Sequence, residues 1–391
     1  MTDKIAAYKD DLVTLRRDIH KHPELAYEET RTADIVAGKL QSWGIEIHRG
    51  LATTGVVGTI RAGTGNRAIG LRADIDALPI DELNDFDHRS AHDGKMHACG
   101  HDGHTAMLLG AARYLAETKN FDGTVHLIFQ PAEEAAGGAR VMIEDGLFEK
   151  FPVENVYGMH NMPGLPLGEF HMRTGPLMAG FLSFVIEVQG IGAHAGFPHL
   201  GRDSIVIASS IVTALQTIVS RTVDPLDSAL VSVTKIKGGH AFNVLPEKVM
   251  LGGSCRAFSD AMLDRLKQQI IDIAEGTART HGANAKVDFV EYYPPLVNTA
   301  EAVEATAAAA RDVAGSDRVN TSATPVMGSE DFAYMLKEKP GSYIFIGNGP
   351  GEGGCLLHNP HYDFNDEILV TGAQYWCRLV ERELAVKKSA A

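Results

Sequence analysis

The sequence predicts an α/β protein in which a larger domain with a mainly parallel sheet carries an inserted, ferredoxin-like α+β domain. Three observations support this fold class. The 391 residues exceed one ordinary domain and suit two. Strand-like and helix-like patterns alternate toward both ends of the chain, which is typical of a parallel sheet. Between them the order changes to β-α-β-β-α-β, the order of the ferredoxin-like split unit. We therefore expect one domain from residues 1–180 and 295–391, and an inserted domain from residues 181–294.

The first part of the chain predicts helices followed by strands. Ile5, Leu12 and Ile19 recur on one side of a helix, which stops at His22-Pro23 because proline disfavours helix in the residue before it. A further helix is expected at about residues 28–43 and another at about 104–117, with strands at 55–60, 68–73 and 125–129. The last of these strands is almost continuously apolar, as expected for a strand covered on both faces.

The middle of the chain predicts one sheet with two helices on a single face. The strands are expected at residues 181–189, 229–237, 248–258 and 285–292, and the helices at 203–221 and 259–280. The α/β pattern resumes after Pro294-Pro295. It continues with a strand at 343–346, a Gly-rich loop at 347–354 and a last helix at about 366–386.

Charge and cysteine content exclude several classes of protein. The formal net charge is −14, from 50 acidic and 36 basic residues, which argues against nucleic acid or an anionic membrane as partner. Four widely spaced cysteines form no disulfide framework and suit a reducing compartment. The N-terminus lacks the apolar core of a secretory signal, and no apolar run reaches the roughly 18 residues that span a bilayer. A cytoplasmic protein is expected.

The strongest local motif is His97-Ala98-Cys99-Gly100-His101-Asp102-Gly103-His104. Its metal-ligating residue types stand two and three positions apart, in a loop between a strand region and a helix. Ligands bind at such strand-to-helix loops in α/β sheets. A thiolate and an imidazole favour zinc or a similar transition metal over Mg²⁺ or Ca²⁺. The alternative is a histidine-rich loop in which Cys99 is simply buried.

Other candidate ligands lie in three further segments. Glu133 and Glu134 directly follow the most apolar strand, where charges need partners. One of them could bind metal while the other transfers a proton, and the alternative is a solvated acidic loop. His160 follows a short apolar segment and His358 follows the Gly-rich loop. Among 17 histidines, a single one is more often structural than a ligand.

Together these segments resemble peptidase family M20, and more narrowly its branch of hippurate hydrolases, bacterial aminoacylases and plant indole-acetyl-amino-acid hydrolases. Further matching motifs are Arg16–Leu25, Arg72–Pro79, Phe242–Pro246 and Gly328–Phe332, so the resemblance covers effectively the whole chain.

The resemblance implies a site for two divalent metal ions in the larger domain. Zinc or manganese is expected, and cobalt or nickel could be accepted. The implied ligands are Cys99, His101, Glu134, His160 and His358, with Cys99 as the candidate bridge and Glu133 as the general base. Much of the family has a ligand histidine where this chain has Arg72, so Cys99 and His101 must supply that ligation. Asp74 and Asp76 could orient ligands or cap the loop, and both roles stay open. His104 is expected to be structural.

The resemblance also makes the inserted domain a lid and dimerisation module, in a homodimer or homotetramer. His194 would reach an active site, often that of the partner subunit, and help to hold the scissile carbonyl oxygen. Asn243 and Arg256 would grip the α-carboxylate of the substrate, a task that suits the bidentate geometry of arginine. The alternative for Arg256 is a surface ion pair.

The expected function is metal-dependent hydrolysis of the amide bond of N-acyl amino acids, such as hippurate or N-acetyl compounds. The products would be a carboxylic acid and a free amino acid. The alternatives are a dipeptidase or carboxypeptidase, or a non-catalytic metal-binding or amino-acid-binding protein on the same fold. Glu133 retained beside every ligand type argues against a non-catalytic protein. The acyl group and the amino acid are left open.

Overall fold

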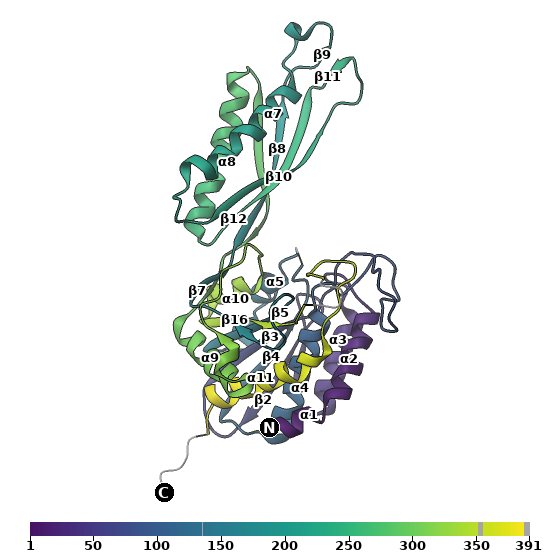
Figure 1. The fold of residues 1–391 in the computed structure, drawn as a ribbon, viewed down its shortest axis with the longest axis vertical. Coiled ribbons are helices and arrows are strands. Elements are labelled where there is room, and N and C mark those ends of the chain that lie inside the picture. Colours follow the sequence, from purple (N-terminus) through teal and green to yellow (C-terminus); the bar gives the residue numbers. More distant parts are fainter. Residues whose placement is uncertain (135, 351–354, 387–391) are drawn as a thin grey trace. The chain divides into compact units, whose positions relative to one another are not determined.

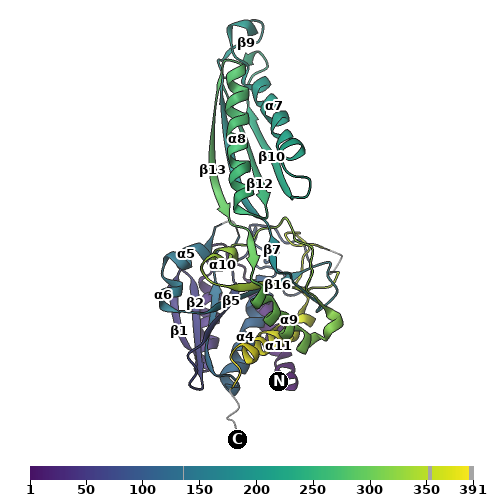
Figure 2. The same ribbon diagram turned by 90° about the vertical axis from the view of Figure 1, so that its left-hand side faces the viewer.

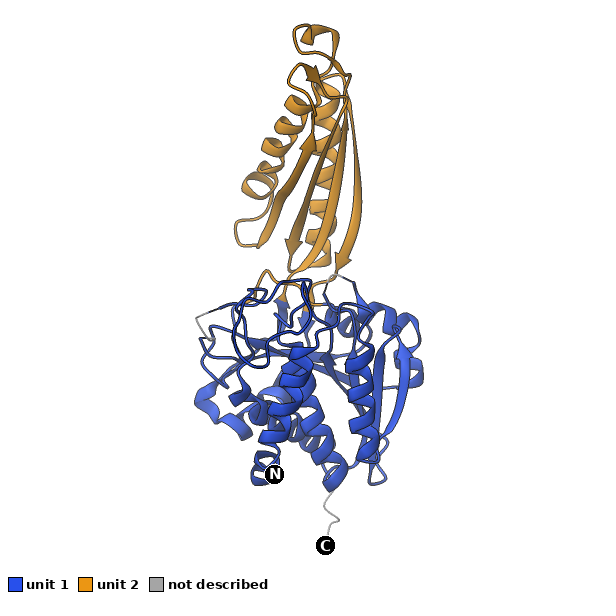
Figure 3. Ribbon diagram, turned by 90° about the vertical axis from the view of Figure 1, so that its right-hand side faces the viewer, with its two compact units in different colours: residues 1–177, 297–324, 331–391 blue, residues 178–296, 325–330 orange. Residues whose placement is uncertain are grey.

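A computed structural model describes residues 1–134, 136–350 and 355–386, and the chain divides into two compact units (Figure 3). Unit 1 comprises Met1–Leu177, Val297–Thr324 and Asp331–Ala391, and unit 2 comprises Met178–Leu296 and Pro325–Glu330. Unit 2 thus begins and ends within three residues of the predicted insertion at 181–294 and adds a short later segment. Residues 351–354 of the predicted Gly-rich loop lie outside the described residues.

The unit 1 sheet has the strand order β1-β2-β4-β3-β5-β16-β6-β15. Its strands are β1 (Glu46–Leu51), β2 (Gly55–Ala62), β3 (Ala68–Asp74), β4 (Gly123–Gln130), β5 (Asn155–Met162), β6 (Phe170–His171), β15 (Val319–Asn320) and β16 (Gly341–Gly347). The central strands β4, β3, β5 and β16 are parallel, whereas β1 and β2 form an antiparallel edge. A short ribbon pairs β7 (Gly175–Met178) with β14 (Leu296–Asn298). The predicted mainly parallel sheet is confirmed.

Helix α4 is the most deeply buried helix of unit 1, and four of the other helices, α1, α2, α3 and α11, contact it. The helices of unit 1 are α1 (Thr2–Ala6), α2 (Lys9–Lys21), α3 (Thr30–Ser42), α4 (His101–Thr118), α5 (Gly138–Glu144), α6 (Leu147–Lys150), α9 (Ala300–Ala314), α10 (Phe332–Glu338) and α11 (Leu369–Glu383). Helix α4 contacts α2, α3 and α11 as well as strand β3 (Figure 1). Almost every residue from His101 to Leu115 is therefore buried.

The parallel strands bring the chemically important segments to one edge of the sheet. Strands β3 and β4 are in register, so that Asp74 lies beside Gln130 where both strands end. Strand β5 carries His160 near its own end, where it pairs with Phe345 of β16. Because the carboxyl ends of parallel strands share one edge, the loops that follow them meet there, as ligand-binding loops do in α/β proteins.

Unit 2 has the predicted order β-α-β-β-α-β. The unit 2 sheet has the order β10-β12-β8-β13, and all its neighbouring strands are antiparallel. Its elements are β8 (Gly180–Gln189), α7 (Ser204–Leu215), β10 (Ala229–Gly238), β12 (Lys248–Ala257), α8 (Asp260–Thr280) and β13 (Asn284–Tyr293). Helices α7 and α8 lie side by side along the sheet (Figure 2). Strand β8 alternates buried and partly exposed residues, as a sheet covered on one face requires.

The helical segment Ser204–Thr222 corrects one expectation. By length and composition alone it could cross a membrane, although the sequence was expected to hold no such run. The segment has no charged side chain before Arg221. The hydroxyl groups of its serine and threonine residues donate hydrogen bonds to carbonyl groups one turn earlier in the helix. Ile207, Ile211 and Leu215 are buried in the core of unit 2, although only 28% of the segment's apolar window is buried inside the structure.

Candidate metal centre and active site

The sharp turn at Gly100 places Cys99 and His101 on the same site. Gly100 precedes helix α4 with φ 89°, a left-handed conformation that favours glycine. A Cβ atom there would lie 2.3 Å from Nδ2 of Asn161 and 2.5 Å from the hydroxyl oxygen of Tyr362. No larger residue fits without displacing both polar side chains. The glycine of the motif is therefore a steric requirement of the turn.

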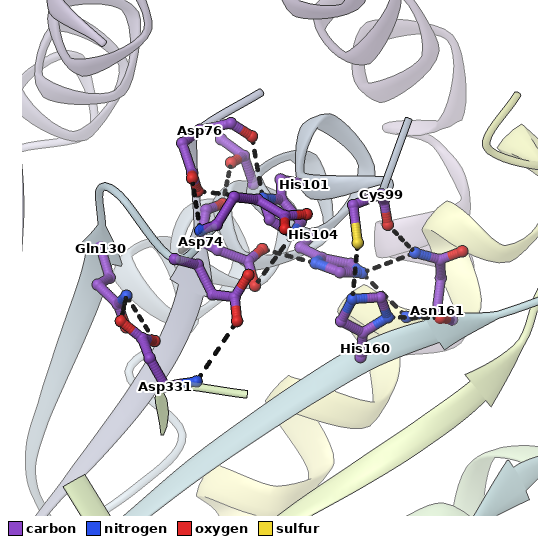
Figure 4. A network of polar contacts seen from close by, with 12 residues as sticks. Asp74, Asp76, Cys99, His101, His104, Gln130, His160, Asn161 and Asp331 are labelled. Atoms are coloured by element: carbon purple, nitrogen blue, oxygen red, sulfur yellow. Dashed lines mark hydrogen bonds and ion pairs between the residues drawn. The ribbon is translucent and has the colours of Figure 1, made fainter. Parts of the chain in front are cut away.

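One cluster of candidate ligands consists of Cys99, His101 and His160. Their ligand atoms all lie within 4.8 Å of one another, and all three side chains are buried. The Cys99 Sγ atom is 3.3 Å from Nε2 of His160 (Figure 4). His160 uses Nδ1 for a hydrogen bond to the carbonyl oxygen of Asn161, so its Nε2 atom is directed toward the cluster.

A second cluster consists of Cys99, Glu134 and His358, again within 4.8 Å of one another. The Nε2 atom of His358 lies 3.1 Å from Oε1 of Glu134. His358 has φ 62°, and a non-glycine residue in this region is strained, which is frequent at functional sites. The two clusters share Cys99, so the five residues predicted as ligands come together around one thiol.

Glu133, the predicted base, lies beside the ligands. Its carboxylate, the Glu134 carboxylate and an imidazole nitrogen of His101 fall within 4.8 Å of one another. Glu133 is only 6% exposed, and its Oε1 atom accepts a hydrogen bond from the backbone N–H of Asp331 at 3.4 Å. The two neighbouring carboxylates share this cluster but have different partners, since Glu133 accepts from the Asp331 backbone and Glu134 lies beside His358.

The donor set fits a divalent cation. In the described part of the chain, Nε2 of His101 is buried and has no hydrogen-bond partner. Burial, followed by the Glu134 and Glu133 carboxylates, holds the pKa of the Cys99 thiol well above its usual value. A cation among these donors would offset that repulsion and stabilise the thiolate. Thiolate, imidazole and carboxylate together are the ligand set of zinc and similar transition metals.

Asp76 orients a predicted ligand. Nδ1 of His101 lies 2.9 Å from the Asp76 carbonyl oxygen and 3.2 Å from its Oδ1 atom, which leaves Nε2 free for metal. The other carboxylate oxygen accepts the backbone N–H of Glu134 at 2.9 Å. Burial lowers the pKa of His101, but the carboxylates of Asp74 and Asp76 outweigh it and raise that pKa to about 10. Of the two roles left open for Asp76, the structure favours orientation of ligands.

Asp74 and His104 belong to the support behind the ligands. Asp74 lies 2.6 Å from Nδ1 of His104 and accepts a hydrogen bond of 2.6 Å from Arg72. The other ring nitrogen of His104 accepts the backbone N–H of Asn161 at 2.9 Å. With both ring nitrogens engaged, His104 is a structural residue, as expected.

The Asp76→Asn variant is expected to bind metal about 10–100-fold more weakly, the usual effect of removing a partner that orients a metal ligand. One carboxylate oxygen becomes an NH₂ group, so either His101 keeps only the Asp76 carbonyl oxygen as its acceptor or the Glu134 backbone loses its acceptor. Competition with a chelator of known affinity measures the change. The matched control is Asp81→Asn in the same segment, whose exposed side chain caps only Gly94. Equal affinities for both variants would show that Asp76 orients nothing.

His194 and Asn243 lie together in unit 2. Strand β9 (Ala193–His194) pairs with β11 (Val244–Leu245), and the Ala195 backbone N–H donates to the Asn243 carbonyl oxygen at 2.9 Å. Both side chains are exposed. The small ribbon therefore presents the predicted carbonyl-binding histidine and the predicted carboxylate-binding asparagine on one exposed segment.

Arg256 lies elsewhere in unit 2, near the end of β12. Its guanidinium donates to the Met327 carbonyl oxygen at 2.7 Å and to Oγ of Ser329 at 3.0 Å. It also lies 5.3 Å from the ring centroid of Phe181, and burial lowers its pKa. No carboxylate pairs with it among the residues that the structure describes, so the surface ion pair is not what holds it.

The unit 2 sheet separates Arg256 from the β9–β11 ribbon. Arg256 pairs with Phe181 at one end of β8, whereas Lys248 pairs with Gln189 at the other end, shortly before His194. That length of strand corresponds to about 26 Å at the usual rise per residue. The structure therefore does not bring Arg256 together with His194 and Asn243 within one chain.

Two supporting residues, Asp331 and Glu29, were not identified as site residues from the sequence. The Asp331 carboxylate is fully buried and accepts hydrogen bonds from Nε2 of Gln130 at 2.9 and 3.0 Å and from the Ala139 backbone at 2.8 Å. Glu29 accepts from the backbone of Ala132 at 2.9 Å. Both are distant in sequence from the residues they hold, so no local spacing reveals them. Only membership of the motif Gly328–Phe332 distinguishes Asp331.

Comparison with known proteins identifies the family. Residues 70–382 match the model of peptidase family M20/M25/M40. The chain is 41% identical to a hippurate hydrolase of Campylobacter jejuni, over 95% of this chain and 96% of the relative. It is 40% identical to IAA-amino acid hydrolase ILR1-like 4 of Arabidopsis thaliana, over 97% and 87%. A dinuclear metal-binding peptidase of family M20 from Bacillus subtilis has a solved structure that matches with TM-score 0.84 and 34% identity, over 97% of this chain and 99% of that chain.

These matches cover the segments that supply both clusters and Glu133. They confirm the family that the motifs indicated and agree with a site for paired metal ions. The chain belongs to peptidase family M20.

Proposed function

We propose that this hydrolase cleaves the amide bond of N-acyl amino acids at a pair of divalent metal ions. The observation that carries the proposal is the pair of ligand clusters that share Cys99, with the buried Glu133 beside them. The names of the relatives support the substrate class, because hippurate is N-benzoylglycine and IAA-amino acids are likewise N-acyl amino acids. The products are a carboxylic acid and a free amino acid.

In this proposal Cys99, His101 and His160 would hold one ion, and Cys99, Glu134 and His358 would hold the other, since both clusters include Cys99. Zinc or manganese suits these donors, and cobalt or nickel could replace them. When bound, the ions would supply Lewis acidity and lower the pKa of water to about 7.

Glu133 performs the proton transfers. It accepts the proton of the attacking water and delivers it to the leaving amine, the task of a general base that later acts as a general acid. Its burial and the hydrogen bond from the Asp331 backbone hold the carboxylate in one position, which the transfer requires. His194 donates a hydrogen bond to the scissile carbonyl oxygen as negative charge develops on it. Arg256 and Asn243 bind the α-carboxylate and orient the amide bond.

The separation within unit 2 supports a homodimer with shared active sites. If Arg256 and the β9–β11 ribbon serve the same substrate, they come from different chains, because the unit 2 sheet lies between them in one chain. Helix α7 also presents an exposed face without charges, including Ile205 and Val206, which suits an interface between copies. The four cysteines are free thiols, which supports a location in the cytoplasm.

Mixed dimers test this arrangement. His194→Ala and Arg256→Ala are each expected to lose most activity alone. When the two variants are unfolded and refolded together, about one quarter of wild-type activity should return, because half the dimers pair the two variants and half their sites carry both residues. The control is a double variant that carries His194→Ala and Arg256→Ala in the same chain. It is unfolded and refolded in the same way. If the mixture recovers nothing, His194 and Arg256 act within one chain or at different steps.

Substrate ranking tests the proposed chemistry. The metal-loaded enzyme is expected to release amino acid from N-benzoylglycine or N-acetyl amino acids faster than from a plain dipeptide, measured as kcat/KM by amine release. Faster cleavage of the dipeptide would replace the proposal with a peptidase. Binding without turnover of any of them would replace it with a binding protein on the same fold.

A further inference from the structure

We infer that Glu29 is a positioning residue for the general base, an inference that rests on the proposed function. Glu29 lies directly before helix α3 and is fully buried. Its Oε1 atom accepts the backbone N–H of Ala132 at 2.9 Å, and its Oε2 atom accepts the hydroxyl group of Thr54 at 2.7 Å. Ala132 is the residue before Glu133, so Glu29 holds the backbone from which the base projects.

The backbone at Ala132 needs an external acceptor. Ala132 has φ 57°, a conformation that L-residues with a side chain rarely adopt, and it is fully buried. A buried N–H group must find a partner in a folded protein. The Ala132 carbonyl oxygen accepts from Gly138 at 2.9 Å, while its N–H group is satisfied by Glu29. The Glu29 carboxylate therefore stabilises the unusual turn that aims Glu133.

Three buried carboxylates from three segments hold the loop that carries Glu133 and Glu134. Glu29 accepts the N–H group of Ala132, Asp76 accepts that of Glu134, and Asp331 accepts that of Ala139. Asp76 also holds His101, and Asp331 also bonds Glu133, so both belong to the site by direct contact. Within the described residues, Glu29 forms its hydrogen bond to this loop at the backbone of Ala132. Its effect on catalysis passes through the backbone of the loop.

The hydrogen bond from Thr54 to Glu29 allows variants that keep the acceptor for the Ala132 N–H group to be compared with variants that remove it. An amide at position 29 can still accept the Ala132 N–H group with its oxygen, while its NH₂ group donates to Thr54, whose hydroxyl group then accepts. Burial also raises the pKa of Glu29 to about 7, even though the Thr54 hydroxyl group favours the charged form. Because the neutral form is populated near neutral pH, an amide is a fair substitute. Alanine at this position leaves the Ala132 N–H group unpaired.

The test compares Glu29→Ala, Glu29→Gln and the control Thr54→Val in the metal-loaded enzyme. Glu29→Ala is expected to lose kcat by about 10–100-fold for N-benzoylglycine, since a displacement of about 1 Å at a reacting group costs this much. The fold-change in KM should be smaller than the fold-change in kcat, and the metal content should equal that of the wild type. Glu29→Gln should restore most of kcat. Thr54→Val leaves the acceptor of the Ala132 N–H group in place and should therefore keep the kcat of the wild type.

Each other outcome overturns a defined claim. If Glu29→Ala keeps wild-type kcat, or loses kcat only in proportion to lost metal, Glu29 does not position the base. If Glu29→Ala does not fold, Glu29→Asp replaces it, because its carboxylate is one methylene shorter and the same loss of kcat is required. If Glu29→Gln is as slow as Glu29→Ala, the hydrogen bond to Ala132 is not the cause. If the wild type itself turns over no N-acyl amino acid, the proposed function fails and the inference falls with it.

Discussion

Glu133→Gln is expected to bind both metal ions and to lose kcat by a factor of about 10²–10⁴, the usual contribution of a general base. Glutamine matches the shape of glutamate and keeps an oxygen that can accept the Asp331 N–H group, so the loop should not move. It cannot take up the proton of the attacking water. Because Glu133 is 6% exposed, no bulk water or buffer base reaches its position easily to substitute for it.

Metal content distinguishes the base from a ligand. The Glu133 carboxylate lies within 4.8 Å of ligand atoms of His101 and Glu134, so a role in metal binding is the competing explanation. The amounts of bound metal and kcat should be measured on the same preparation. The matched control is Glu144→Gln in helix α5, whose exposed side chain pairs with Arg140 and should leave both quantities unchanged. If Glu133→Gln loses metal in parallel with activity, Glu133 is a ligand and another group accepts the proton.

Arg72→Met is expected to destabilise unit 1 by about 3–5 kcal/mol, the usual cost of removing one partner of a buried ion pair. Arg72 is 1% exposed and bonds Asp74 at 2.6 Å, Asp331 at 3.1 Å and Gln130 at 2.8 Å. Without it, two buried carboxylates lose the cation that they share. Denaturant unfolding with a chelator present measures the change without the stabilisation that bound metal adds.

The pH dependence of that stability has a definite sign. Burial raises the pKa of Asp74, but His101 and then Arg72 outweigh it, so the pKa lies well below 3.8. The stability from this depressed pKa is present above the unfolded value and is lost as pH falls through the native one. The difference in the free energy of unfolding between the wild type and Arg72→Met should therefore become smaller in strong acid. The control Arg61→Met removes an exposed pair with Glu46 and should cost about 0–1 kcal/mol. A similar small cost for Arg72→Met would contradict the account.

Arg72 also explains a departure from much of the family. Where those relatives place a ligand histidine, this chain has an arginine whose guanidinium is occupied by Asp74, Asp331 and Gln130. The position has become part of the support for the loops. In the proposed site, Cys99 and His101 would supply the ligand atoms instead.

The clusters were predictable from the sequence because their residues lie in short motifs at the ends of strands. Cys99 and His101 are fixed by one turn, Glu134 follows the apolar strand β4, and His160 lies near the end of β5. The supporting carboxylates could not be found this way. Glu29 and Asp331 are far from the loop in sequence, and only the packing of helix α3 and the start of α10 brings them to it.

The sequence prediction missed several elements, among them strand β5 and helix α9, and it misplaced the bounds of others. Strand β1 is mostly exposed and polar, with His48 and Arg49 in its middle, so it lacks the alternation that marks a half-buried strand. The first predicted helix divides into α1 and α2 around Tyr8, although its apolar positions continue across the break. The α-helix predicted at 203–221 ends at Leu215 and continues as the wider turn Ile218–Thr222. In each case contacts with the rest of the fold decide the boundary.

Reconstitution with metal tests the central claim most directly. The protein should be stripped of metal with a chelator, supplied with increasing Zn²⁺ or Mn²⁺, and assayed for amine release from N-benzoylglycine and N-acetyl amino acids. The account predicts no activity without metal, a rise that ends at about two ions per chain, and no comparable rise for Glu133→Gln. Full activity in the stripped protein, or no turnover of any N-acyl amino acid with any metal, would contradict it.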